Sequence, residues 1–208
     1  MKMKIILATH NLDKCAEMMA IMEKMPIKLL SLNKFPEIEE IYEDGKTLAE
    51  NAFIKAITVH KQTGLPAIAD DTGLEVDALD GKPGIYSARY AGEYCSYSDN
   101  VTKLLREMIN IPKKKRSALF RTVIVYVDHN MELVAEGIVE GIITDVTKGI
   151  DGFGYDPVFY VPGMKKTYAE MNMNEKNQHS HRGKAVRKMQ KLLTSRLPKI
   201  SHQMEDIA

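Results

Sequence analysis

The 208-residue sequence has no tryptophan, only two cysteines and no long apolar run. Cys15 and Cys95 lack C-x-x-C spacing, which excludes a disulfide framework and a structural zinc site built on cysteine. No segment approaches the roughly 18 apolar residues that a membrane-spanning helix needs. The apolar run of residues 5–8 is too short for the core of a signal peptide. We therefore expect a cytoplasmic protein that does not enter membranes.

Net charge is also nearly absent, because 29 Lys and Arg face 28 Asp and Glu, for a formal charge of +1. Such a chain has no global field that would favour nucleic acid or an anionic membrane. The basic run of residues 113–116 is interpreted as a solvated loop before a strand. The alternative is a nucleic-acid-binding patch, which would show salt-sensitive retention on DNA.

The length fits a single domain over residues 1–208, with two lobes and a loosely held tail from about residue 197. Short apolar runs predict strands, and apolar residues at helical spacing predict amphipathic helices. Two long Val- and Ile-rich runs joined by residues 128–130 predict an antiparallel hairpin. We expect an α/β fold with an elongated mixed sheet, flanking helices and one cleft between the lobes. The predicted strands are residues 4–8, 28–32, 67–69, 119–127 and 133–143, and the predicted helices are residues 12–25, 48–63, 98–108 and 181–193.

Two adjacent carboxylates, Asp70 and Asp71, follow the short predicted strand of residues 67–69. They would repel each other unless a cation or hydrogen-bond donors offset the charge. A divalent metal is one explanation, and an ordinary solvated turn is the other. Glu43, in an acidic connection, could share such a metal with Asp71, since Mg²⁺ needs only one or two carboxylates beside substrate phosphates.

The segment Thr9-His10-Asn11-Leu12-Asp13-Lys14 stands between a predicted strand and a predicted helix. The free N–H groups at a helix start favour an anion, and a hydroxyl, an amide and an ammonium group are close by. Lys55 on the next helix could add a second cation. The alternative is that Asn11 only caps the helix and that both lysines lie at the surface.

Phe153 stands between two glycines in a polar loop, where an aromatic ring gains little from core packing. A nucleobase could stack on it, or the ring could simply anchor the loop in the core. Lys176, His181 and Arg182 gather at the start of the last predicted helix. They offer hydrogen-bond donors to a polar heterocycle, although helix capping and solvated charge would explain them equally.

Together these segments resemble the inosine triphosphate pyrophosphatase family, which hydrolyses ITP, dITP and XTP. The resemblance covers residues 5 to about 193, and its six motifs occur in the family's order. The matching segments are ATHNLDK at 8–14 with Glu17, EDGKTLAENA at 43–52 with Lys55 and Ala56, ADDTGL at 69–74, PGIYSARY at 83–90, GFGYDP at 152–157 and SHRG at 180–183.

The resemblance implies an elongated α/β fold with a nucleotide-binding cleft between two lobes, and a homodimer. It implies hydrolysis of these triphosphates to the monophosphate and pyrophosphate, with Asp71 as the base. Glu43 and Asp71 would bind Mg²⁺, for which Mn²⁺ could substitute. By the same resemblance, Thr9, Asn11, Lys14 and Lys55 would hold the triphosphate, Phe153 would stack on the purine, and the purine would be enclosed by Tyr155, Asp156, Lys176, His181 and Arg182. The other implied substrate-binding residues are His10, Leu12, Asp13, Thr72 and Gly154.

The sequence departs from the family pattern at two positions. Thr72 stands where serine is usual and keeps the hydroxyl, whereas His10 replaces a glycine where backbone is expected to approach phosphate. Because of His10, the alternative of a nucleotide-binding regulator without turnover stays open. The presence of both Glu43 and Asp71 argues against that alternative. A pyrophosphatase for other modified nucleotides is the nearest enzymatic alternative.

Overall fold

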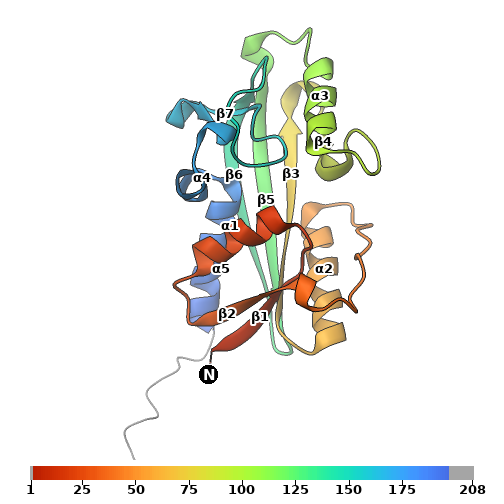
Figure 1. Ribbon diagram of the computed structural model, residues 1–208, viewed down its shortest axis with the longest axis vertical. Helices are drawn as coiled ribbons and strands as arrows, with labels where there is room; N and C mark the ends of the chain where they lie inside the picture. The colour runs from red at the N-terminus through yellow and green to blue at the C-terminus, as the bar shows by residue number, and fades with distance from the viewer. Residues whose placement is uncertain (1, 197–208) are drawn as a thin grey trace, which may run out of the picture.

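The computed structural model describes residues 2–196, which fold around an open sheet of eight strands (Figure 1). The strand order is β2-β1-β3-β5-β6-β7-β8, and β4 pairs with the edge of β3. Strands β2, β1 and β3 run parallel, and the other pairings are antiparallel. The tail expected from about residue 197 lies outside the described residues. The strands are β1 Met3–Leu7, β2 Ile27–Ser31, β3 Ala67–Val76, β4 Pro83–Gly84, β5 Ser117–Val127, β6 Glu132–Ile143, β7 Phe159–Val161 and β8 Lys166–Thr167.

Five α-helices flank this sheet within residues 2–196, and the caps of α2 show how the sequence sets their ends. Thr47 accepts a hydrogen bond from the Glu50 N–H, and Gly64 closes the helix in the left-handed conformation at φ 68°. The Glu50 carboxylate binds the Lys46 N–H, so only half of a capping box forms. The helices are α1 Leu12–Met22, α2 Leu48–Thr63, α3 Tyr97–Glu107, α4 Met173–His179 and α5 His181–Arg196.

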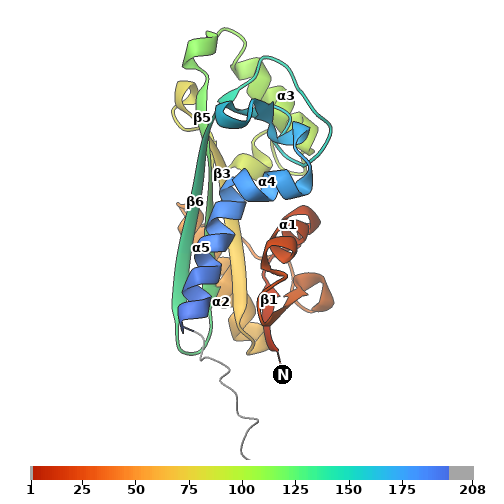
Figure 2. The ribbon, with the colours of Figure 1, turned by 90° about the vertical axis from the view of Figure 1, so that its left-hand side faces the viewer.

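The helices divide between the two faces of the sheet. Helix α5 lies along β5 and β6 with α1 beside it, and α2 covers β3 and β5 from the opposite face (Figure 2). Strand alternation supplies both cores, because Ile68 and Ile124 face α5 whereas Ala69 and Val123 face α2. None of the helices in this part of the chain is long and apolar enough to cross a membrane.

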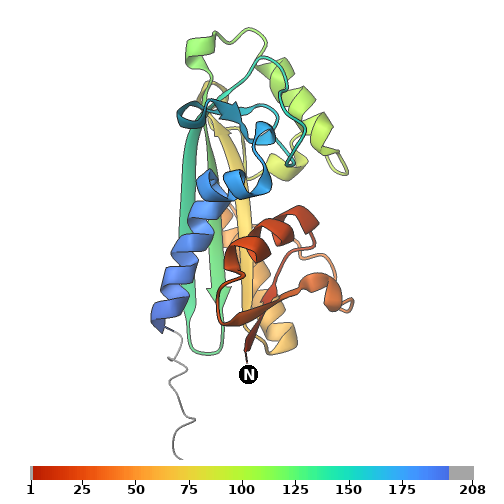
Figure 3. The same ribbon diagram turned by 60° about the vertical axis from the view of Figure 1, so that its left-hand side comes forward.

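The long strands β3, β5 and β6 continue beyond these helices into a second lobe with α3, β7 and β8 (Figure 3). A separate apolar core fills this lobe, where Phe120 from β5 packs against Phe159 and Tyr168. The α/β fold with an elongated mixed sheet and flanking helices is therefore confirmed, and two lobes share that sheet.

One strand is far longer than the sequence predicted. The expected strand of residues 67–69 was to stop at the two aspartates, but β3 runs unbroken from Ala67 to Val76. It pairs with β5 along its whole length, and this partner lies about 50 residues further along the chain, as the register of Thr72 opposite Thr122 shows. Cross-strand pairing thus overrides the local turn chemistry of Asp-Asp-Thr-Gly.

The other edge of β3 is open over a short stretch. Strand β1 pairs with β3 only at Ala67 and Ile68, and β4 joins the same strand only at Leu74 and Glu75. The residues between them lie beside the end of β1, where the chain turns into α1. A strand edge between two lobes provides the place for a site, since side chains of both faces reach it.

Candidate active site

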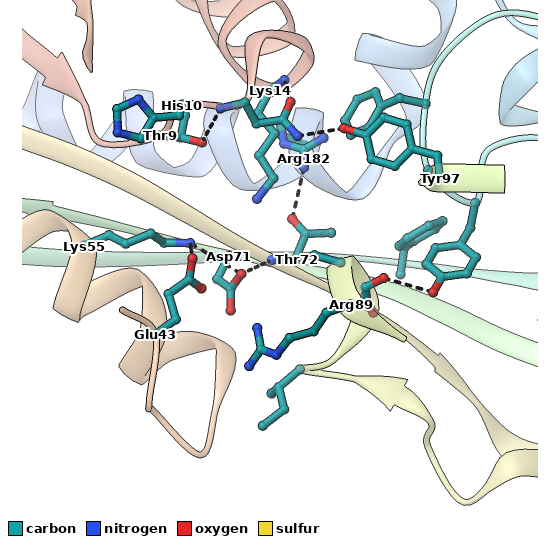
Figure 4. A pocket seen from close by; sticks show the side chains of 18 of the residues that line it. Thr9, His10, Lys14, Glu43, Lys55, Asp71, Thr72, Arg89, Tyr97 and Arg182 are labelled. Carbon is teal, nitrogen blue, oxygen red and sulfur yellow. Dashed lines mark hydrogen bonds and ion pairs between the residues drawn. The ribbon is translucent and has the colours of Figure 1, made fainter. Parts of the chain in front are cut away.

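A cavity of about 300 Å³ lies beside the open edge of β3, with walls from both lobes. Figure 4 shows side chains from α1, α2, β3 and α5 converging on it. Every site residue predicted from the sequence lines this cavity except Leu12 and Asp13. The prediction that one cleft collects these distant segments is therefore confirmed in its geometry.

The side chains of Leu12 and Asp13 turn away from the cavity, and the contact of these two residues with substrate stays a prediction. Leu12 is 67% exposed, and the Asp13 carboxylate is turned to the Tyr97 hydroxyl at 3.4 Å. Residues three apart share a helix face, so Asn11 and Lys14 point into the cavity while the two residues between them point away.

The start of α1 forms one end of the cavity. Asn11 caps the helix, with its side-chain oxygen accepting from the Lys14 N–H at 3.0 Å, and the Thr9 hydroxyl accepts from the Asn11 N–H at 3.2 Å. The Lys14 ammonium lies 3.3 Å from Asp70. Helix N–H groups and an ammonium group thus face the same space, which suits a phosphate.

His10 does not fill this space as its replacement of glycine suggested. Its ring nitrogen Nδ1 lies 3.0 Å from the Asn33 side-chain oxygen, and the side chain is exposed. The backbone there keeps a negative φ, so no glycine is needed for its conformation. The observation that favoured a regulator without turnover is therefore weakened.

The paired aspartates of β3 point to opposite faces of the sheet, because successive strand residues alternate. Asp70 is fully buried and bonds to Arg182 and to Thr72, both at 3.2 Å. Asp71 reaches the cavity from the α2 side, where it accepts from Asn51 Nδ2 at 3.2 Å. The two carboxylates thus avoid the mutual repulsion that their adjacency in sequence suggested.

Lys55 stands between the two carboxylates predicted to hold a metal (Figure 4). Its ammonium lies 3.1 Å from Glu43 Oε1 and 3.5 Å from Asp71 Oδ1. Burial disfavours the charged lysine, but Asp71 and Glu43 outweigh burial and raise the pKa of Lys55. Two carboxylates and one ammonium leave this group with a formal charge of −1 beside the cavity.

On the opposite face, five buried charges and the partly buried Lys14 form a continuous chain of alternating sign. Arg182 joins Asp70 to Glu17, and Lys176 joins Glu17 to Asp156, with ion pairs between 2.5 and 3.3 Å. Burial raises the pKa of Glu17, but Arg182 and Lys176 outweigh burial and lower that pKa overall. The chain carries no net charge, and in order it consists of Lys14, Asp70, Arg182, Glu17, Lys176 and Asp156.

The loop of residues 152–156 forms the other end of the cavity. Asp156 is 3% exposed and accepts from the Phe153 N–H at 2.8 Å, while burial raises the pKa of this carboxyl despite the adjacent Lys176. The Lys176 ammonium lies 4.5 Å from the centre of the Phe153 ring, and the Tyr97 ring lies 5.8 Å from it. An aromatic surface is thus held at the cavity wall by a buried ion pair.

His181 and Tyr155 line the same end, where the Tyr155 hydroxyl and one ring nitrogen of His181 already have hydrogen-bond partners. The Tyr155 hydroxyl donates to the Ser87 carbonyl at 2.9 Å, which ties the loop to the second lobe. His181 Nδ1 lies 2.6 Å from the Thr122 hydroxyl, and its ring stacks on Phe120. Burial and the nearby Arg182 lower the pKa of His181 well below its usual value, so this imidazole is neutral at pH 7.

The profile of the Ham1 family matches residues 5–192, which include every residue of the site. The chain belongs to the Ham1 family. It is 46% identical to a protein from Desulforamulus reducens over 92% of this chain and 96% of the relative. It is 48% identical to a protein from Halalkalibacterium halodurans over 90% of this chain and 97% of the relative. Both relatives are named dITP/XTP pyrophosphatase.

Solved Ham1 structures share the fold described above. A HAM1 protein from Coxiella burnetii is 40% identical, with a TM-score of 0.85 over 93% of this chain and 99% of its own. A dITP/XTP pyrophosphatase from Mycobacterium abscessus is 38% identical, with a TM-score of 0.70 over 94% and 100%. The overall fold is therefore shared with both solved structures.

Sequence reasoning gave no role to Glu17, Asn51 or Tyr97, and it offered Asp70 only as a possible partner of Asp71 at a metal, yet this Ham1 chain places all four at the site. Glu17 and Asp70 belong to the buried ionic chain, Asn51 binds Asp71, and the Tyr97 hydroxyl accepts from the Asn11 amide at 2.9 Å. Glu17 follows Lys14 by three residues, a spacing that already put both on one helix face. Tyr97 comes from α3 in the second lobe, and nothing in its sequence context indicates this contact.

Proposed function

We infer that this protein hydrolyses non-standard purine nucleoside triphosphates, namely ITP, dITP and XTP, to the nucleoside monophosphate and pyrophosphate. Relatives that share nearly half of its residues carry the name dITP/XTP pyrophosphatase. The observation that carries the inference is one cavity whose lining includes a capped helix start, Lys14 and Lys55, the carboxylates of Glu43 and Asp71, and the Phe153 ring. These are the groups that a triphosphate, a cation and a purine require.

The donor set fits Mg²⁺, which we propose as the metal, with Mn²⁺ as a substitute. Glu43 and Asp71 share one ammonium and keep a surplus negative charge. Among the residues that the structure describes, no third His, Cys, Asp or Glu completes a metal-binding cluster with them. Substrate phosphates and water would supply the other ligands, as is usual for Mg²⁺. When bound, the metal neutralises phosphate charge and lowers the pKa of a coordinated water.

The reaction breaks the bond between the α phosphorus and the oxygen that bridges to the β phosphorus. A water oxygen attacks the α phosphorus, and the bridging oxygen leaves with pyrophosphate. The Asp71 carboxylate takes the proton of the attacking water, since this side chain lines the cavity. Lys14 and Lys55 stabilise the charge that builds on the departing pyrophosphate.

The purine would stack on Phe153, with Arg182 beside it. Three of the five guanidinium N–H groups already bind Asp70, Glu17 and Thr72. The other two, on Nη1 and Nη2, remain for the C6 oxygen of hypoxanthine or xanthine. Adenine carries an amino donor at C6, and each buried donor left unpaired costs about 1–3 kcal/mol, so ATP is disfavoured by about 10² or more.

The test is a panel of nucleoside triphosphates with Mg²⁺, with products separated as phosphate or pyrophosphate. We expect pyrophosphate as the product and a kcat/KM ratio of ITP over ATP of about 10² or more. A ratio near one would remove the proposed base selectivity. Release of single phosphates would refute the proposed bond cleavage.

Two further proposals concern assembly and location: the proposal of a homodimer rests on the family resemblance, and that of a cytoplasmic location rests on the composition of the sequence. We propose that the protein works as a homodimer and that it is cytoplasmic. Sedimentation equilibrium checks the first proposal, and a single species at the mass of one chain would contradict it. Cell fractionation checks the second.

A further inference from the structure

One buried amide connects Asp71 with the loop that carries Glu43, the other carboxylate of the proposed metal site. Asn51, on the first turn of α2, is 1% exposed. Its Nδ2 donates to Asp71 Oδ2 at 3.2 Å, and its Oδ1 accepts from the Gly45 N–H at 2.8 Å. Gly45 follows Glu43 by two residues, so this one side chain contacts Asp71 and the loop that carries Glu43.

The orientation of the amide follows from its partners. The Gly45 N–H can only donate, so it requires the amide oxygen. The amide nitrogen must then face Asp71, whose ionised carboxylate can only accept. Turning the amide over would place donor against donor and acceptor against acceptor, so both contacts specify the same arrangement.

The loop also lacks the room for a side chain at position 45. A Cβ at Gly45 would lie 2.6 Å from Asn51 Oδ1, 2.8 Å from Glu50 Cβ and 2.9 Å from the Asn51 backbone nitrogen. These distances are shorter than van der Waals contact, and two of the three neighbours belong to Asn51 itself. The close approach of the loop to Asn51 therefore depends on glycine.

We propose that Asn51 is a positioning residue that holds Asp71 and the Glu43 loop together, so that the two carboxylates face one cation. This inference deepens the proposed function and rests on it. Lys55 binds both carboxylates as well, but through a flexible side chain. The planar amide fixes direction as well as distance, which is how groups behind metal ligands raise metal affinity.

The test uses Asn51→Ala, which removes both hydrogen bonds, and Gly45→Ala, which pushes the loop away while leaving Asn51 and Asp71 intact. Leu193→Ala is the control, because Leu193 is fully buried near the far end of α5 and lies outside the site. Electron paramagnetic resonance of free Mn²⁺ gives the metal dissociation constant of each protein in the presence of α,β-methylene-ITP, an analogue that resists cleavage. Thermal unfolding and the Mg²⁺ activation constant for ITP hydrolysis are measured in parallel.

We expect Asn51→Ala and Gly45→Ala each to raise the Mn²⁺ dissociation constant by about 10-fold to 100-fold, and to raise the Mg²⁺ activation constant by a similar factor. Leu193→Ala should lower the melting temperature and leave both constants within about twofold of wild type. The proposal would be overturned if wild type and Asn51→Ala had the same Mn²⁺ dissociation constant. It would also be overturned if Leu193→Ala raised that constant as much as Asn51→Ala does. If the variants raise the Mn²⁺ dissociation constant as expected but the wild-type protein does not hydrolyse ITP, the proposed function is refuted and the positioning role of Asn51 is supported.

Discussion

The two faces of β3 carry neighbouring aspartates that do different things. On the face of α1 and α5, Asp70 is buried among cations, which outweigh the cost of burial and hold its pKa far below its usual value. On the face of α2, Asp71 shares the single cation Lys55 with Glu43 and opens to the cavity.

The difference is one of charge balance and access. The six-membered ionic chain around Asp70 pairs every charge with an opposite one inside the protein. The Glu43, Lys55 and Asp71 group leaves one negative charge uncompensated beside a space that can admit a cation. Removing one partner of a neutralised buried pair leaves the other charge buried and unpaired, which destabilises the fold. An uncompensated charge at a cavity is instead available to bind a cation.

The largest effect is expected from Asp71→Asn, which alters the aspartate on the cavity side of β3. The change keeps the shape but removes the charge and the basicity, so we expect kcat for ITP to fall by about 10² to 10⁴. Circular dichroism and melting temperature should stay close to wild type, because Asp71 lies at the cavity wall. Near-normal kcat would show that Asp71 is not the base.

Whereas Asp71→Asn is expected to lower kcat, Asp70→Asn should lower the stability of the protein. It leaves the buried Arg182 with one charge partner fewer, and we expect the free energy of unfolding to drop by about 3–5 kcal/mol. Urea unfolding at pH 7 measures it. A loss below about 1 kcal/mol would mean that the ionic chain is not structural. Asp70 would then contribute far less to stability than its buried ion pairs indicate.

The neutral His181 makes the α5 face sensitive to pH. Its pKa in the folded protein lies well below 6.5, whereas in the unfolded chain it takes up a proton near that value. The stability that it contributes is therefore complete above pH 6.5 and is lost as the pH falls toward the folded pKa. We expect a loss of at most about 1.4 kcal/mol per pH unit.

Urea unfolding of wild type and His181→Asn between pH 7.5 and 5 checks this slope. Groups other than His181 contribute to both proteins and cancel in the difference. The variant should lose less stability than wild type over this range. Parallel curves for the two proteins would contradict a buried neutral His181.

The smallest effect is expected from Tyr97→Phe, where the two lobes meet. The ring stays beside Phe153, but the hydrogen bond to Asn11 is lost, for about 0.5–1.5 kcal/mol. KM for ITP should change by less than about tenfold, with kcat within twofold. Tyr94→Phe, whose side chain is fully exposed, is the control. A large fall in kcat would place Tyr97 in the chemistry instead.

Much of this protein is determined by local sequence. Thr47 and Gly64 mark the ends of α2 through a side-chain cap and a left-handed turn, and the hairpin of β5 and β6 follows from its Val- and Ile-rich strands. The motifs around Asn11, Asp71 and Phe153 predicted one cavity, which the fold confirms. Their chemical roles remain predictions for the experiments above.

Only the tertiary structure decided what surrounds each of these groups. The alternation of β3 would place two adjacent aspartates on opposite faces, but the sequence predicted a strand that stopped before them, because pairing with β5 is a long-range interaction. The ion pair of Glu17 with Arg182 joins residues 165 positions apart. Asn51 likewise meets Asp71 across 20 residues. Such contacts depend on how helices pack against the sheet, and local sequence carries no record of that packing.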